Sequence, residues 1–199
     1  SEMYGGTQLS SQNEKTSFDP QSPYAASKVY AHFITKIYRN AYNIFACNGI
    51  LFNHESPYRG ETFVTKKIIK ALVNIKKGKQ KTLYLGNLYA KRDWGHAEDY
   101  VVSMWKILNS KKPDDFVIAT NQQKTIKQFV NLVCKKLNIK IFWKGKGIQE
   151  KGYDKEKKVI IKIDKRYFRP LEVDNLKGNF SKAKRLLKWS PKIKLSQLI

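Results

Sequence analysis

Several features that would place the chain in a common class are missing from its sequence. No apolar run approaches the roughly 18 residues that a membrane span needs, and the first residues lack the basic and then apolar layout of a signal peptide. We therefore expect no membrane partner. The sequence also contains no GxGxxG, GxxGxxG or GxxxxGK[ST] loop, so nothing in it predicts a cradle for a pyrophosphate.

Cysteine is scarce: Cys47 and Cys134 are the only two, and both lie in apolar runs. Neither belongs to a CxxC motif or to a cysteine–histidine spacing typical of zinc sites. We predict buried free thiols and no metal site, and we expect a reducing, cytoplasmic location.

Acidic residues are also few, with 16 Asp and Glu against 39 Lys and Arg, and the formal net charge is +23. Such a charge is compatible with nucleic-acid binding. The lysines, however, are scattered over predicted helix faces and turns, and no zinc-finger spacing, RNA-recognition signature or arginine-rich arm occurs. We favour solvated lysine faces over a nucleic-acid groove. A non-catalytic basic module that binds nucleic acid is the alternative from another functional class.

The composition predicts a globular chain, since 41% of its 199 residues are hydrophobic. The chain begins at Ser1 without an initiator methionine, and the final LSQLI resembles the first turn of a helix. We expect a fragment of a longer protein. A processed or trimmed chain is the alternative.

Helical and extended patterns alternate along the chain, which predicts an α/β fold. Helical spacing predicts helices over 24–40, 63–77, 97–108, 125–137 and, capped by Ser181, 181–189. Apolar runs predict strands over 44–52, 82–85, 115–120, 139–143 and 158–163. The first of these strands reads as buried on both faces, as in a parallel sheet. The polar segment 144–157 is predicted to be a surface loop, and all four tryptophans are predicted to be core or semi-core residues.

The stretch SPYAASK (22–28) places a tyrosine and a lysine four residues apart. Ser22 is a suitable N-cap and Pro23 suits a first helical position, so Tyr24 and Lys28 are expected on one helix face. An ammonium near a phenol stabilises the phenolate, and such a tyrosine can take a proton from a substrate alcohol. The alternative is that the two side chains merely pack together. Taken alone, the spacing favours this alternative, because such pairs arise often by chance in a lysine-rich chain.

Other motifs accompany this pair: SEMYG (1–5), NGILFNHESPYRGETFVTKKI (48–68), LGNLYAKRDWGHAEDYV (85–101) and YFRPLEV (167–173). Together they resemble the GDP-mannose 4,6-dehydratases, a family of extended short-chain dehydrogenases/reductases, from Ser1 almost to Ile199. SPYAASK and the SE-x-YG opening are common to many nucleotide-sugar dehydratases and epimerases. NGILFNHESP together with RDWGHAEDYV is more specific to the GDP-mannose family.

The resemblance implies the second half of a Rossmann-type NADP-binding domain plus a smaller C-terminal substrate-binding part. Residues 1–60 would be the C-terminal portion of the Rossmann-type domain, with the Tyr/Lys helix. Residues 61–199 would form a mixed substrate-binding region, from which some strands and helices return to the Rossmann part. The family also implies a homodimer or homotetramer, and we expect the 199-residue chain alone not to turn over.

The resemblance also assigns roles to single residues. Glu2 matches the general acid/base of the elimination, Tyr24 matches the catalytic tyrosine, and Lys28 matches its partner, which also holds the nicotinamide ribose. His54 and Arg59 match positions that contact NADP, as Tyr24 and Lys28 also do.

Four positions resemble contacts to the substrate GDP-mannose: Asn53 near the diphosphate, and Arg92, Arg169 and Glu172 at the GDP part. An arginine fork suits phosphate oxygens and a carboxylate suits ribose hydroxyls. The alternatives are a surface ion pair of Arg92 with Asp93 and an Arg169 that braces a loop. One departure from the family pattern is Tyr58, which stands in SPYRG (56–60) where the family usually has arginine.

The implied reaction converts GDP-mannose to GDP-4-keto-6-deoxymannose and water, with NADP used and regenerated. Another nucleotide-sugar dehydratase, an epimerase or a related decarboxylase with the same glutamate and tyrosine–lysine logic is the alternative among enzymes.

Overall fold

The structure, a computed structural model, describes residues 1–168 and 171–199. The chain divides into two compact units. Unit 1 comprises residues 1–56, 91–124 and 171–198, and unit 2 comprises residues 57–90, 125–170 and 199. Each unit therefore collects segments that are distant in the sequence. The functional labels expected for 1–60 and 61–199 stay predictions.

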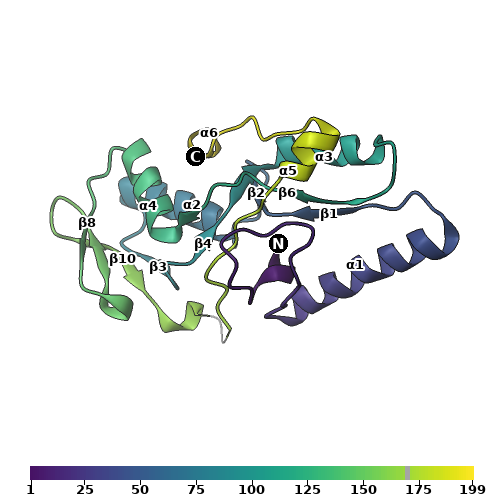
Figure 1. Cartoon of the computed structure of the whole chain (residues 1–199). Helices are drawn as coiled ribbons and strands as arrows, with labels where there is room; N and C mark the ends of the chain where they lie inside the picture. The colour runs from purple at the N-terminus through teal and green to yellow at the C-terminus, as the bar shows by residue number, and fades with distance from the viewer. Residues whose placement is uncertain (169–170) are drawn as a thin grey trace. The chain divides into compact units, whose positions relative to one another are not determined.

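Unit 1 contains parallel strand pairs with helices on both sides. Its elements are η1 (Glu2–Tyr4), α1 (Pro23–Tyr42), β1 (Asn48–Leu51), β2 (Asn53–Glu55), β4 (Lys91–Arg92), β5 (Trp94–His96), α3 (Ala97–Leu108), β6 (Asp115–Ile118), α5 (Ser181–Leu187) and α6 (Leu195–Leu198). β1 pairs with β6 and β2 with β5, both in parallel. Figure 1 shows α1 on one side of the β1–β6 pair and α3 with α5 on the other. Parallel strands between helix layers confirm the predicted α/β class.

The β6 strand is buried on both faces, because consecutive side chains point to opposite sides of a sheet. Val117 and Ala119 belong to one core cluster, and Phe116 and Ile118 belong to the other. The first cluster also contains Met3, Tyr4, Ile50, Phe52, Val173 and Leu176. The second also contains Tyr100, Ile107, Ala183, Leu187 and Trp189. The N-terminal segment thus packs on the first face, and α3 and α5 cover the second.

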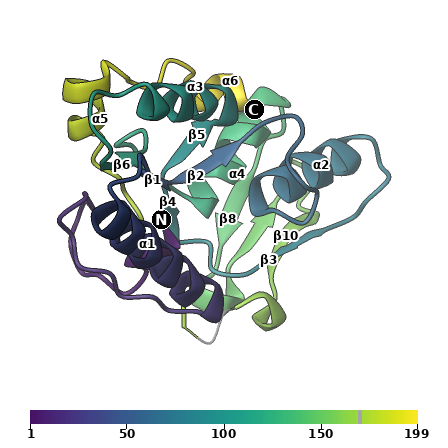
Figure 2. The same cartoon turned by 90° about the vertical axis from the view of Figure 1, so that its right-hand side faces the viewer.

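Unit 2 is built on a four-stranded mixed sheet. Its elements are α2 (Val64–Lys76), β3 (Leu83–Leu85), α4 (Ile126–Lys136), β8 (Phe142–Lys144), η2 (Gly147–Gln149), β9 (Lys151–Tyr153), β10 (Val159–Ile163) and η3 (Lys165–Tyr167), and the short β7 (Lys124–Thr125) lies at its boundary with unit 1. The strand order is β3-β10-β9-β8, in which β3 and β10 are parallel and the other pairs antiparallel. α2 contacts both α4 and β3, as Figure 2 illustrates for α2 and β3.

Local sequence signals set several helix ends. Ser22 Oγ accepts a hydrogen bond from Ala25 N at 3.1 Å, and Pro23 is the first residue of α1. Thr125 and Gln128 form a reciprocal capping box at the start of α4. Gly78, just after α2, has φ +70°, a value that glycine adopts without a steric penalty. The predicted helix 97–108 is confirmed with the same bounds.

The continuous strand predicted over 44–52 is wrong at its first half. β1 begins only at Asn48, opposite Asp115, where β6 also begins. Asn43 has φ 51° and ends α1, and the exposed Ile44 and Phe45 lie in the connection. An apolar run becomes a strand only where another strand is available to pair with it.

The surface loop predicted over 144–157 is also wrong, because it contains η2 and the β9 strand. β9 pairs with β8 on one side and with β10 on the other. Gly152 lets these strands approach closely: a Cβ there would lie 3.0 Å from Ile161 Cβ. The sequence KGY (151–153) has no run of apolar residues, so its strand is set by its neighbours rather than by its own pattern.

Some burial predictions need correction. Trp94 and Trp189 are buried as predicted, and Trp143 is partly buried, but Trp105 on α3 is 66% exposed. Cys134 is a buried free thiol, and burial raises its pKa to about 12. Cys47 is a free thiol but only partly buried.

The predicted N-cap Ser181 is instead the first residue of α5. The cap position is Phe180, and it provides no side-chain hydrogen bond. Asn179 Oδ1 accepts from Ser181 N at 2.9 Å, so an asparagine two residues upstream takes up this donor.

Candidate active site

Glu2 lies on η1, which is anchored beside the end of β1. Ser1 N donates a hydrogen bond to Leu51 O at 2.8 Å, and both Met3 and Tyr4 are buried in the core. Glu2 itself is only partly buried. Its neighbours therefore provide the packing, and the residue that carries the carboxylate stays partly accessible.

Tyr24 and Lys28 lie on the same face at the start of α1, as their spacing predicts. Lys28 Nζ is 5.4 Å from the centroid of the Tyr24 ring. Tyr24 is 61% exposed and Lys28 is exposed, whereas the adjacent Ala25 is buried. The buried Ala25 packs the start of the helix against the rest of unit 1, and the side chains of Tyr24 and Lys28 remain accessible to solvent.

The elements that carry Glu2 and the Tyr24–Lys28 pair are neighbours. η1 and α1 contact each other within unit 1, and Val29 of α1 packs against the core cluster that contains Met3 and Tyr4. The structure thus places a carboxylate-bearing turn beside the helix end that carries a phenol and an ammonium.

Asn53 and His54 lie on β2, which continues from the end of β1. His54 Nδ1 is 2.9 Å from Phe52 O, which fits a ring that donates from Nδ1. The His54 ring also lies 4.8 Å from the Tyr100 ring, centroid to centroid. Asn53 Oδ1 is buried and has no hydrogen-bond partner within residues 1–168 and 171–199. An amide oxygen in this position can accept a hydrogen bond from a ligand.

Arg92 and Glu172 come together within unit 1. Arg92 Nη2 lies 3.6 Å from Glu172 Oε1, and Arg92 Nη1 donates to Val173 O at 2.6 Å. Arg92 is only 9% exposed, so a surface ion pair with Asp93 does not describe it. The pairing links two positions that the sequence assigns to the same nucleotide, although they lie about 80 residues apart in the chain.

Asp93 is instead a buried acceptor. It accepts hydrogen bonds from Thr120 N at 2.9 Å, from Thr120 Oγ1 and from Gly178 N at 3.2 Å. Burial raises its pKa to about 6, and these hydrogen bonds oppose the shift. Asp93 therefore joins three segments of unit 1 and has a structural role.

The two remaining predicted residues are Arg59 in unit 2 and Arg169. The Arg59 guanidinium carbon lies 3.4 Å from the centroid of the Phe63 ring, a cation–π contact that fixes the side chain in the turn before α2. Arg169 lies outside the described residues. The nearby Tyr58, which replaces a usual arginine of the family, is 97% exposed.

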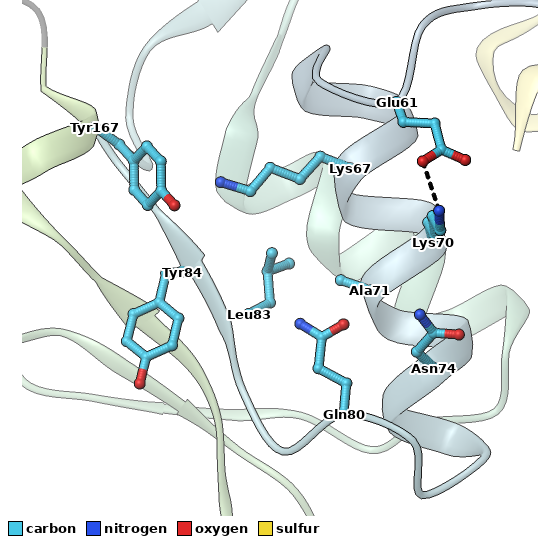
Figure 3. A pocket seen from close by; sticks show the side chains of 9 residues that line it. All are labelled: Glu61, Lys67, Lys70, Ala71, Asn74, Gln80, Leu83, Tyr84 and Tyr167. Atoms are coloured by element: carbon cyan, nitrogen blue, oxygen red, sulfur yellow. Dashed lines mark hydrogen bonds and ion pairs between the residues drawn. The ribbon is translucent and has the colours of Figure 1, made fainter.

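Unit 2 contains a polar cavity of about 260 Å³ between α2, β3 and η3. Its lining residues are Glu61, Lys67, Lys70, Ala71, Asn74, Gln80, Leu83, Tyr84 and Tyr167. Figure 3 shows the Lys67 ammonium directed at the Tyr167 ring, 3.6 Å from its centroid. Lys70 Nζ pairs with Glu61 Oε2 at 2.6 Å.

The sequence alone does not predict this cavity, because the lysines of α2 follow the pattern of a solvated helix face. The signal was present in the spacing: Lys67, Lys70, Ala71 and Asn74 follow the i, i+3, i+4, i+7 pattern of one helix face. What the spacing could not show is that η3, about 100 residues later in the chain, brings Tyr167 to the same face.

Among the described residues, no group of three or more histidine, cysteine, aspartate or glutamate side chains is arranged to hold a metal ion. No helix within residues 1–168 and 171–199 is both long enough and apolar enough to cross a membrane.

Comparison with known proteins gives a consistent family. The family model described as GDP-mannose 4,6 dehydratase matches residues 1–199. GDP-mannose 4,6 dehydratase of Dictyostelium discoideum is 52% identical over 200 residues, which cover 100% of this chain and 56% of that protein. GDP-mannose 4,6 dehydratase 1 of Arabidopsis thaliana is 51% identical, with 100% and 50% covered. The chain thus spans about half the length of these relatives.

Solved structures support the fold. The structure of RMD from Pseudomonas aeruginosa, complexed with NADPH, matches with a TM-score of 0.80 at 18% identity, over 98% of this chain and 60% of that one. The dTDP-glucose 4,6-dehydratase of Bacillus anthracis, in complex with NAD, matches with a TM-score of 0.78 at 23% identity, over 98% and 56%. At these identities the likeness concerns the fold, and it agrees with the predicted Rossmann-type α/β class.

Proposed function

The chain belongs to the GDP-mannose 4,6-dehydratase family, and we propose that the complete protein converts GDP-mannose to GDP-4-keto-6-deoxymannose and water. The observation that carries this proposal is the contact of η1 with α1, which brings Glu2 and the Tyr24–Lys28 pair onto adjacent elements of one unit. Because the chain spans about half of its relatives, the activity is proposed for the complete protein and not for the chain alone.

Tyr24 is the proposed base that takes the proton from the C4 hydroxyl of the sugar. The Lys28 ammonium lies 5.4 Å from the centroid of the Tyr24 ring. Exposure of both side chains supports access of a substrate to the pair.

Glu2 is the proposed acid/base of the elimination. Its carboxylate would remove the C5 proton and pass it to the hydroxyl that leaves C6 as water. C5 is reprotonated after the hydride returns to C6, and the proton that Tyr24 took from the C4 hydroxyl balances this step. The buried Met3 and Tyr4 hold the η1 backbone, so the Glu2 side chain can act from a fixed support.

The proposed cofactor is NADP, and the residues present fit such a group. Lys28 offers an exposed ammonium that can donate to ribose hydroxyls, and it lies beside the Tyr24 ring. His54, oriented by Phe52 O, and Arg59 are the further proposed contacts. When bound, NADP supplies the hydride acceptor for C4 and the hydride donor for C6, so the net reaction is loss of water.

The GDP part of the substrate is proposed to contact Arg92 and Glu172, with Asn53 near the diphosphate and Arg169 as a further contact. The Arg92–Glu172 pair supports a joint role, since the arginine suits phosphate and the carboxylate suits ribose hydroxyls. Separately, the unit 2 cavity is lined by lysines and tyrosines that suit an anionic ligand.

A homodimer or homotetramer and a cytoplasmic location complete the proposal. Large apolar side chains on α1 support self-association, since Tyr30, Phe33, Ile37 and Tyr38 are each about half exposed or more. Light scattering on the complete protein would measure its oligomeric state, and a monomer at micromolar concentration would count against this part.

The test of the Tyr24 role is Tyr24→Phe in the complete protein. Turnover should fall by at least about 100-fold, because the C4 proton loses its acceptor, while NADP stays bound. Tyr30→Phe is the matched control, since Tyr30 is an equally exposed tyrosine on the same helix. Near-normal turnover of Tyr24→Phe would show that this tyrosine is not the base.

Glu2→Gln separates the two chemical steps. The amide cannot take the C5 proton, so elimination should slow far more than the first oxidation at C4. The measurement is exchange of the C5 hydrogen and release of water from a supplied 4-keto sugar nucleotide. If Glu2→Gln lost only the oxidation and processed that intermediate normally, the assignment would be wrong.

A further inference from the structure

A buried charged cluster contacts α1 beyond its first turns, away from the helix start that carries Tyr24 and Lys28. The stripe of α1 that faces the unit 1 core contains Ala25, Val29 and His32. Arg39, about two helical turns further along, is also largely buried. Beyond Val29, this stripe is polar. The second half of α1 is therefore attached to the sheet by a histidine and an arginine, while its large apolar side chains face outward.

Asp115, the first residue of β6, receives these contacts. Arg39 Nη1 donates to Asp115 Oδ1 at 3.0 Å, and Asn48 Nδ2 donates to the same oxygen at 2.9 Å. His32 Nε2 lies 3.8 Å from Asp115 Oδ2. The side chains of His32, Arg39 and Asp115 are only 8%, 12% and 13% exposed. The paired strands β1 and β6 thus contact α1 through the Asp115 carboxylate. Two more hydrogen bonds support this attachment: Asn48 Nδ2 donates to His32 O at 3.3 Å, and Arg39 Nη1 donates to Ala46 O at 3.1 Å.

The electrostatics agree with an ionised carboxylate in this cluster. Burial acts to raise the pKa of Asp115, but the hydrogen bonds from Arg39 and Asn48 outweigh it and lower that pKa. Burial lowers the pKa of His32, although Asp115 acts in the opposite direction. Lys182 Nζ donates to the Asp115 carbonyl oxygen at 2.9 Å, so the backbone of this residue is also held.

The same histidine connects the cluster to the segment that carries Glu2. The His32 ring meets the Phe18 ring edge-on at 4.8 Å, and Phe18 lies 5.1 Å from the Tyr4 ring, both measured between centroids. Tyr4 belongs to η1 together with Glu2. A continuous set of contacts therefore runs from Asp115 through His32 and Phe18 to the η1 turn.

We propose that Asp115 is a positioning residue for the reaction. It fixes α1 against β1 and β6, and in this way it sets the position of the Tyr24 and Lys28 side chains relative to Glu2. This inference rests on the proposed function. Asp115 is not among the residues assigned to substrate or cofactor, and its contacts to α1 are those with His32 and Arg39. The rotation of a helix about its axis moves every side chain on it, and a displacement of about 1 Å in an active site can cost 100-fold in rate.

The experiment compares Asp115→Asn with Asp114→Asn in the complete protein. The control residue is adjacent in sequence and pairs with Lys182 at 2.7 Å rather than with α1. It also accepts a hydrogen bond from Asp115 N at 2.7 Å, which the asparagine oxygen of the control variant can keep. The readout is the first-order rate constant of C4 oxidation in a single turnover, measured together with KM for GDP-mannose. Partial misfolding reduces the amplitude of a single turnover and leaves its rate constant unchanged, whereas misplacement of Tyr24 lowers the rate constant itself.

Asp115→Asn should lower this rate constant by about tenfold or more and change KM little, and Asp114→Asn should leave both unchanged. Equal rate constants for the two variants and the wild type would overturn the proposal. If Asp115→Asn does not fold, Arg39→Gln removes the charge from the other side and is expected to give the same loss.

Hydrogen exchange supplies a readout that does not depend on activity. The α1 amides around His32 and Arg39 should exchange faster in Asp115→Asn than in Asp114→Asn, because the contacts of these two side chains with the Asp115 carboxylate are lost. Unchanged exchange would overturn the proposal. An inactive wild type would refute the proposed function instead, and the exchange comparison would still test whether Asp115 fixes α1 against β1 and β6.

Discussion

At the scale of single residues, Asp93 is a buried acid whose contribution to stability depends on pH. Burial raises its pKa to about 6. A carboxyl whose pKa is raised on folding stabilises the folded state in its protonated form. That contribution is present below about pH 4 and is lost as the pH rises through about 6.

Asp93→Asn removes this titration. The free energy of unfolding of the wild type, minus that of Asp93→Asn, should fall by up to about 3 kcal/mol between pH 4 and pH 7. Urea unfolding of both complete proteins across this range measures the difference. A constant difference, or one that grows with pH, would show that the Asp93 pKa is not raised.

The cavity of unit 2 makes a second prediction at this scale. Lys67 faces the Tyr167 ring at 3.6 Å, a contact that orients its ammonium. Tyr167→Leu should raise KM for GDP-mannose about threefold, which corresponds to a cation–π contact at an exposed site. Tyr167→Phe, which keeps the ring, serves as the control and should behave as the wild type. Equal KM values for both variants would show that the ring does not orient Lys67 for substrate.

Residue chemistry was predictable from the sequence where spacing decides it. Tyr24 and Lys28 meet because they are one helical turn apart. Arg92 and Glu172 were assigned to the same nucleotide from separate motifs, but their direct pairing depends on how distant segments fold together. The roles of Glu2, Tyr24, Lys28, Asn53, His54, Arg59, Arg92, Arg169 and Glu172 stay predictions.

At the scale of elements, the start of α4 follows local sequence chemistry, whereas the β9 strand does not. Thr125 and Gln128 carry a capping box that is visible in the sequence and present in the structure. β9, in contrast, consists of Lys, Gly and Tyr and exists because β8 and β10 flank it. Trp105 was predicted to be a core or semi-core residue, but its position on α3 leaves it 66% exposed.

Two helix starts allow a matched comparison of capping. Thr125 Oγ1 accepts from Gln128 N at 3.0 Å, whereas α5 has no side-chain cap and Ser181 is already inside it. Thr125→Ala should lower the free energy of unfolding by about 1 kcal/mol. Ser181→Ala should change it by less than about 0.5 kcal/mol. Chemical denaturation measures both, and equal effects would contradict the assignment of the caps.

At the scale of the whole molecule, apolar side chains gather on two helix faces of unit 1. On α1 they include Tyr30, Phe33 and Ile37, and on α3 they include Trp105 and Leu108, each 48% to 69% exposed. Contiguous exposed apolar surface of this kind marks contact sites in proteins.

The 199-residue chain produced alone should therefore self-associate and should not turn over GDP-mannose. Light scattering would detect the association, and Ile37→Lys with Trp105→Lys should reduce it, while lysine at the exposed polar position Ser27 should not. A monodisperse monomer that dehydrates GDP-mannose would contradict both expectations.

The proposal as a whole depends on which sugar nucleotide the complete protein consumes. The most direct measurement supplies GDP-mannose, UDP-glucose and dTDP-glucose separately, with NADP, and identifies the products by mass. We expect loss of water from GDP-mannose to give the 4-keto-6-deoxy product, and no comparable turnover of the other two sugar nucleotides. Turnover of only UDP-glucose or dTDP-glucose would contradict it.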